Sequence, residues 1–282
     1  MIEIKNKKVV IVWLCVILVL LAGVILTNNQ VEKHETVKEM MRDAVLHDIN
    51  HLNFFGIKEV NPGLISAVIT TAFLLVAAAL IRIFFIPRLK RIPGKFQLLL
   101  EQVVGLFDKF AKTNSPHRNG FLGAYIFGAG MYIFFGTLFE LLGFQAITTT
   151  GHSITLPAPL SDINGAIALG CLSYLVILSG GILANGFRGV GTALKDFSMP
   201  LSMSFRLFGA LLSGVLVTEL VYYYLQLSFV LPLIVGVLFT LLHAVIQTYV
   251  LIMLTASSYG EASKPHKKEK NRHLPVTGGF NN

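Results

Sequence analysis

The chain has 282 residues, of which 54% are hydrophobic and 13% are charged, and its mean hydropathy is +0.69. This composition excludes a soluble globular protein and predicts one all-α polytopic membrane domain, because several apolar stretches reach the ~20 residues that a spanning helix needs. The net charge of +8 does not indicate a nucleic-acid partner, since the basic residues fall in short loops and in the tail, where anionic lipid and the positive-inside rule account for them.

The N-terminal part precedes the main apolar core. Lysines at 5, 7 and 8 precede an apolar run from Val9 to about Thr27, so residues 1–30 are expected to be a transmembrane anchor or a signal-like segment. The run is long for a signal peptide, which favours a retained anchor. Residues 31–62 form a mixed-charge external segment that ends in a turn at Asn61-Pro62-Gly63.

Five further spans and one interfacial helix are predicted along the remaining chain. The spans need long apolar runs, whereas the interfacial helix shows apolar residues at helical spacing with charges between them. In chain order, the elements are a second span from about Leu64 to Ile86, the interfacial helix from Phe96 to about residue 112, and spans at about Phe121–Phe144, Ile163–Leu183, Pro200–Leu227 and Leu231–Thr255.

The distribution of basic residues predicts the orientation of these spans. The segments 1–8, 87–119, 185–197 and the tail hold the lysine and arginine clusters, so six spans with both termini cytoplasmic satisfy the positive-inside rule. The main membrane domain is then expected over residues 63–259, and residues 260–282 form a basic cytoplasmic tail. Helices five and six form a long, tilted hairpin in this prediction.

One arginine, Arg206, lies inside the apolar fifth span. An arginine at membrane depth costs several kcal/mol, so it needs a function or a partner. Residues three or four positions away share its helix face, and all of them are small: Ser202, Gly209, Ala210 and Ser213. A face of small residues allows another helix to approach closely, which predicts a partner helix that moves along this track.

The acidic residues of the spans are expected nearer the outer side than Arg206. Glu219 lies about 20 Å outward on the same helix, Glu140 ends the third span, and Asp162 begins the fourth beside Asn164. No acid within the chain is therefore placed to neutralise Arg206, and a carboxylate on another chain is the predicted partner. The acids either line a wet, cation-attracting vestibule, or they lie at helix ends and face the headgroups. In the second case Asp162 is only an N-cap.

The sixth span carries a polar stripe at helical spacing: Thr240, His243 and Gln247. In an antiparallel hairpin Gln247 comes to roughly the depth of Arg206, where an amide can hold a guanidinium by hydrogen bonds. His243 lies one turn outward and either relays protons or orders water, or is a buried histidine satisfied by a neighbour.

Several motifs resemble one family. The stretches SMPLSMSFRLFGALLSG and HAVIQTYVLIMLT, together with IPGKFQLLLEQVVGLF, FELLGF and PAPLSDINGAIALG, resemble the a-subunit of the membrane sector of F-type ATP synthases over about residues 64–258. Ala210 stands where that family has asparagine. Val215 replaces a polar residue of the family, and Glu219 lies one turn further on as a substitute.

The resemblance implies a non-catalytic stator subunit in a bacterial-type plasma membrane. It implies that Arg206 separates two ion half-channels and drives ion release from a carboxylate on a ring of c-subunits. It implies roles for Gln247 and, in the outer channel, for Glu140, Asp162 and Asn164. The implied partners are the c-ring, peripheral-stalk b-subunits, membrane lipid and, indirectly, the catalytic ATPase sector, without cofactor or metal. The coupling ion stays open between proton and sodium.

Two other functions fit the composition less well. A stand-alone transporter or channel needs an in-chain carboxylate for Arg206 or a pseudo-symmetric repeat, and the sequence offers neither. An intramembrane protease needs more than serines beside glycines, which are usually packing residues. No nucleotide-binding loop occurs, so ATP chemistry is expected to belong to partner chains.

Overall fold

The computed structural model describes residues 14–19, 22, 38, 42, 52–54, 57–117, 119–147, 149, 153–186, 191, 194, 197–223 and 231–264. It confirms the all-α polytopic class. Five helices in these ranges are long and apolar enough to cross a membrane, at Pro62–Arg88, Gly120–Leu142, Ile163–Asn185, Ser198–Thr218 and Leu233–Ala262. Most of the predicted first span and most of the predicted tail lie outside the described residues.

The predicted second span is helix α3 (Pro62–Leu80), which continues through a π-helical turn (Ile81–Phe85) and a 3-10 turn (Ile86–Arg88). Asn61 caps its start by accepting a hydrogen bond from the Gly63 N–H at 2.8 Å. Pro87 has no N–H and its ring crowds the carbonyl four residues earlier, which accounts for the loss of regular helix here. The span therefore ends where the sequence predicts, but through a change of helix type.

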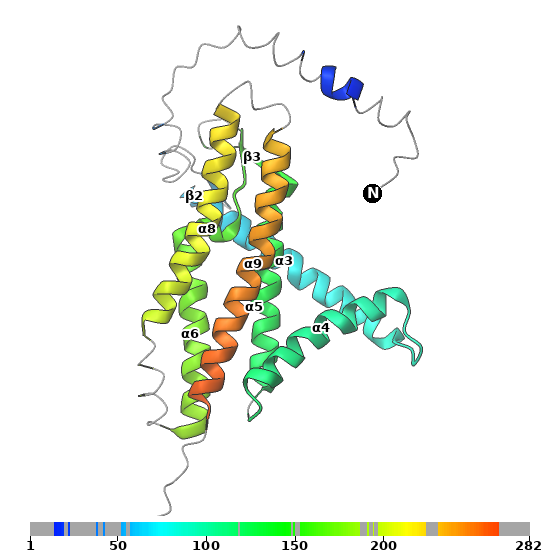
Figure 1. Cartoon of the computed structure of the whole chain (residues 1–282), viewed down its shortest axis with the longest axis vertical. Helices are drawn as coiled ribbons and strands as arrows, with labels where there is room; N and C mark the ends of the chain where they lie inside the picture. The colour runs from blue at the N-terminus through cyan, green and yellow to red at the C-terminus, as the bar shows by residue number, and fades with distance from the viewer. Residues whose placement is uncertain are drawn as a thin grey trace, which may run out of the picture.

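The interfacial helix is α4 (Lys95–Asn114), followed by α5 (Gly120–Phe139) with a 3-10 turn at Glu140–Leu142, and by α6 (Ile163–Asn185). Helices α8 (Ser198–Tyr223) and α9 (Leu231–Ala262) form the long hairpin, side by side in Figure 1. Helices α5, α6, α8 and α9 make the bundle, while α3 and the first half of α4 diverge from it (Figure 1).

The last helix is longer than predicted, because α9 ends at Ala262 instead of about Thr255. Its final turn is held from two sides. The Asn185 Nδ2 group donates hydrogen bonds to the carbonyls of Ala262 at 3.4 Å and Lys264 at 2.8 Å, and the Ser115 and Ser263 hydroxyls are 3.2 Å apart. These contacts come from the ends of α6 and α4, which no local sequence pattern places there.

Two short antiparallel ribbons were not predicted. Strands β1 (Leu52–Phe54) and β2 (Ile57–Val60) precede α3, and strands β3 (Gln145–Ile147) and β4 (Ser153–Thr155) lie between α5 and α6. Both ribbons meet one small buried cluster formed by Leu52, Val60, Ile65, Phe139 and Leu156. The segments expected to be loops are therefore anchored to the N-terminal end of α3 and the C-terminal end of α5.

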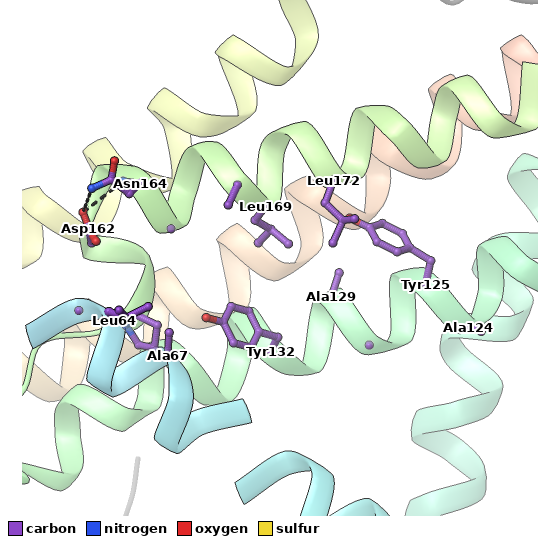
Figure 2. Close-up of a pocket in the computed structure, with 15 residues that line it drawn as sticks. Leu64, Ala67, Ala124, Tyr125, Ala129, Tyr132, Asp162, Asn164, Leu169 and Leu172 are labelled. Carbon is purple, nitrogen blue, oxygen red and sulfur yellow. Dashed lines mark hydrogen bonds between the residues drawn. The ribbon is translucent and has the colours of Figure 1, made fainter. Parts of the chain in front are cut away.

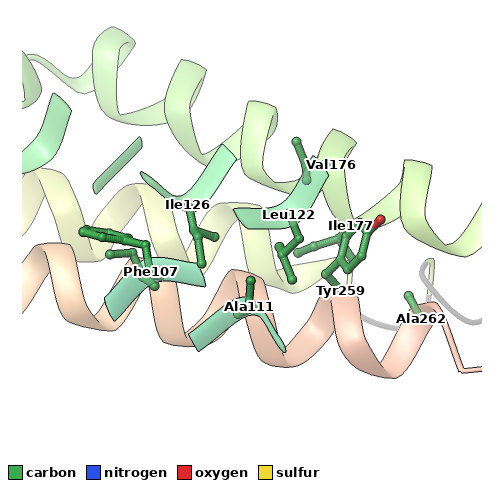
Figure 3. Packing of buried hydrophobic residues seen from close by; sticks show 10 residues of the cluster. Phe107, Ala111, Leu122, Ile126, Val176, Ile177, Tyr259 and Ala262 are labelled. Atoms are coloured by element: carbon green, nitrogen blue, oxygen red, sulfur yellow. The ribbon is translucent and has the colours of Figure 1, made fainter. Parts of the chain in front are cut away.

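The main core lies where α4, α5, α6 and α9 meet, and Figure 3 shows side chains from all four helices in one cluster. Lipid tails are as apolar as leucine, so close packing through small residues holds such helices together. Gly180 and Gly170 of α6 are the clearest cases. A Cβ on Gly180 would meet the Tyr259 ring of α9, and one on Gly170 would lie 2.8 Å from the Pro200 carbonyl oxygen of α8.

Candidate functional site

Arg206 lies on the outward face of α8. The opposite face packs into the bundle through Met203, Leu207 and Leu211, each 2% exposed, at the four-residue spacing of one helix side. Arg206 is one position before Leu207 and is exposed. Helix packing therefore directs the only arginine of α8 away from the core of its own chain.

The small residues around Arg206 share its exposure. Ser202, Gly209 and Ser213 are exposed and Ala210 is half-buried. A Cβ built on Gly209 has no atom within 4 Å, so this part of the face is open space in the structure. The α8 track, defined as these four residues with Arg206, is a smooth helix surface with one positive charge.

No carboxylate neutralises Arg206 among the described side chains. Its guanidinium makes neither a salt bridge nor a hydrogen bond there, and the ion pair found in that part of the chain joins Lys112 Nζ to Asp108 Oδ2 at 2.6 Å on α4.

The polar stripe of α9 turns inward instead. Thr240 and Gln247 are 7% and 6% exposed, and His243 is half-buried, with its ring centroid 5.9 Å from that of Phe239. The Gln247 Oε1 atom is buried and accepts no hydrogen bond from the described residues. A buried amide oxygen without a donor costs free energy, so this position holds an acceptor without a matching internal donor.

The packing of α8 against α9 relates Gln247 to Arg206. A Cβ on Gly214 would lie 3.5 Å from His243 Nδ1, so these two residues face each other across the hairpin. Counting along the antiparallel helices puts Gln247 opposite Ala210, about 6 Å along the axis from Arg206. The amide is therefore about one helical turn from the guanidinium in depth, although one side chain points inward and the other outward.

The acidic residues occupy different environments. Asp162 caps α6, since its Oδ1 accepts hydrogen bonds from the Asn164 N–H at 3.1 Å and from Asn164 Nδ2 at 3.3 Å. Glu140 opens the 3-10 turn after α5 and is half-buried. Glu219 lies on α8 about 20 Å beyond Arg206, and its side chain is outside the described part. The capping role considered for Asp162 is thus present in the structure.

Asp162 and Asn164 also border a groove of about 720 Å³ between α3, α5 and α6. Figure 2 shows this pair at one end of the groove, near Leu64, with the rings of Tyr125 and Tyr132 further along it. Arg206 does not line this groove. The structure therefore pairs Asp162 with Asn164 but does not bring them into one cavity with Arg206.

The two groove tyrosines were missed at the sequence level. Tyr125 and Tyr132 are seven residues apart on α5, which places them on one helix face, and this spacing was the available signal. The Tyr125 and Ser173 hydroxyls are hydrogen-bonded at 2.7 Å, and Ser173 also donates to the Leu169 carbonyl at 2.9 Å.

Among the described residues, no group of three or more His, Cys, Asp or Glu side chains is placed to hold a metal ion.

A comparison with protein-family models gives a match over most of the chain. The family described as "ATP synthase A chain" matches residues 64–259. The matched range includes most of α3, all of α4, α5, α6 and α8, and most of α9. It contains Arg206, Gln247 and the four small residues of the α8 track.

Proposed function

The chain belongs to the ATP synthase A chain family, and we propose that it is the stator subunit that supplies two ion half-channels to a rotating ring of c-subunits. Members of this family are ion-translocating subunits of the membrane sector and are not themselves catalytic. In this proposal, residues 63–259 form the ion-translocating domain. The chain lies in a bacterial-type plasma membrane with both termini cytoplasmic, and b-subunits and the ATPase sector complete the complex.

The exposure of Arg206 on the α8 track carries this proposal. A ring carboxylate that reaches this face meets a fixed positive charge, which stabilises the ionised carboxylate and depresses its pKa. The carboxylate then releases its ion toward one side and cannot pass Arg206 while it still carries one. Arg206 thereby separates an outer half-channel from an inner one.

Gln247 and His243 have supporting roles in the proposal. The Gln247 Oε1, which has no hydrogen-bond partner among the described residues, offers the guanidinium an acceptor about one helical turn away, which orients Arg206 without removing its charge. His243, Glu219, Glu140, Asp162 and Asn164 supply polar groups between the outer surface and the ring. The groove beside Asp162 and the α8 track are separate surfaces, so this outer path is expected to be completed by the ring.

Purification through a tag on the C-terminal tail in mild detergent tests the assignment. We expect an ATPase to co-purify, together with a small membrane hairpin that bears a carboxylate. A chain that is recovered alone or as a homo-oligomer, without ATPase in any of several detergents, would instead support a stand-alone transporter. In that case the group that neutralises Arg206 would have to belong to this chain.

A further inference from the structure

We propose that the turn between α3 and α4 binds the phosphate headgroup of an anionic phospholipid. This basic turn consists of residues 88–95 and carries four exposed cations: Arg88, Lys90, Arg91 and Lys95. The sequence has no aspartate or glutamate between Glu59 and Glu101, so no nearby acid of this segment balances the four charges. Clusters of lysine and arginine at the end of a spanning helix attract anionic headgroups.

The basic turn is held in one geometry by Gln97. The Gln97 amide pairs with both backbone groups of Lys90: Oε1 accepts from the N–H at 3.1 Å, and Nε2 donates to the carbonyl at 2.9 Å. Gln97 Nε2 also donates to Glu101 Oε1 at 2.8 Å. Glu101, the nearest acid along the chain, is thus hydrogen-bonded to the Gln97 amide on α4. The charges are therefore presented by a closed loop, and less conformational entropy is lost when a headgroup binds.

Apolar side chains flank the cations. Ile92 at the tip is 86% exposed, and the rings of Phe85 and Phe96 pack together at 4.6 Å while each remains about half exposed. Leu89 is 45% exposed between Arg88 and Lys90. The combination of four cations with exposed aliphatic and aromatic groups suits a molecule that has both a phosphate and acyl chains.

The position of the basic turn favours lipid over a soluble anion or an acidic protein. It follows α3, a membrane-spanning helix, and Figure 1 shows it at the end of α3 and α4, away from the helix bundle. The first half of α4 is amphipathic and largely exposed, which is typical of a helix that lies in the membrane interface. Headgroups and acyl chains are both available at that depth.

Native mass spectrometry of the purified full-length chain tests this site. Phosphatidylglycerol and phosphatidylcholine are titrated in turn, and the affinity of the most tightly retained lipid is compared between variants. In Lys90→Gln/Arg91→Gln we expect the phosphatidylglycerol affinity to fall about 25-fold, roughly fivefold for each charge removed. Phosphatidylcholine retention should not change. The matched control is Lys109→Gln/Lys112→Gln, which removes two exposed charges from the far end of α4 and should have little effect.

Three results would overturn the proposal. Unchanged phosphatidylglycerol affinity in Lys90→Gln/Arg91→Gln would leave these charges as topology signals only. Displacement of the lipid by excess inorganic phosphate would assign the site to a soluble anion. Cross-linking of Lys90 to a carboxylate of another subunit in the assembled complex, with no phosphatidylglycerol retained, would assign it to a protein partner.

Discussion

Replacing Arg206 with alanine is expected to abolish coupled ATP synthesis while the complex still assembles. The side chain is exposed and makes no ion pair or hydrogen bond with the described residues, so its removal is not expected to destabilise the fold. What is lost is the fixed charge. At 4 Å and an effective dielectric constant of 20, such a charge stabilises an ionised carboxylate by about 4 kcal/mol, which corresponds to roughly 3 pKa units.

Inverted membrane vesicles provide the measurement, with ATP synthesis assayed beside immunoblots of the assembled subunits. Gln247→Leu is the comparator, because it removes a buried amide of similar size but keeps the positive charge. We expect the ATP synthesis rate of Gln247→Leu to fall less than about tenfold, since this variant removes only the acceptor proposed to orient Arg206. Synthesis at the wild-type rate in Arg206→Ala would refute the role of the arginine, and an equally deep loss in Gln247→Leu would refute this ranking.

Gly209→Phe is expected to abolish coupled synthesis without destabilising the chain. A side chain at Gly209 enters open space, so the isolated subunit has room for the phenyl ring. In the proposed complex the phenyl group lies about one helical turn from Arg206. It would prevent a c-subunit helix from making close contact there and would hold the c-subunit carboxylate several ångströms away from Arg206. Function is therefore predicted to fall while the folded chain persists.

The matched control for this variant is Gly105→Phe on α4. Gly105 is likewise helical and has no atom within 4 Å of a built Cβ, so the two substitutions impose similar demands on the chain itself. Thermal unfolding in detergent should give the same midpoint for both variants, and only Gly209→Phe should lose ATP synthesis. Full activity in Gly209→Phe would show that no partner helix approaches this face.

The spanning helices could be predicted because each needs a long apolar run bounded by local signals. The turn predicted at Asn61-Pro62-Gly63 directly precedes α3, and the N-cap considered for Asp162 is present at the start of α6. The small residues around Arg206 could be identified from the sequence. The sequence did not show which side of α8 is buried, because apolar residues occur all around this helix. The packing of Met203, Leu207 and Leu211 into the bundle shows that the buried side is opposite Arg206.

Features that depend on distant partners were not predictable. The last turn of α9 is held by Asn185 and Ser115, which come from the ends of other helices. The two ribbons form around a shared cluster that joins five separate segments. The groove beside Asp162 depends on which side of α6 meets α3 and α5, and periodicity cannot choose that side when nearly the whole helix is apolar.

The most direct test of the central claim is photo-cross-linking from the α8 track in native membranes. Cys15 and Cys171 are first replaced by serine, and a benzophenone maleimide is then attached through Ser202→Cys or Ser213→Cys, both at exposed positions, or through Ser204→Cys, which is buried against α6. We expect adducts with the small carboxylate-bearing ring subunit from the two exposed positions and none from position 204. Adducts with lipid alone at both exposed positions, in membranes that retain ATP synthesis, would contradict the account.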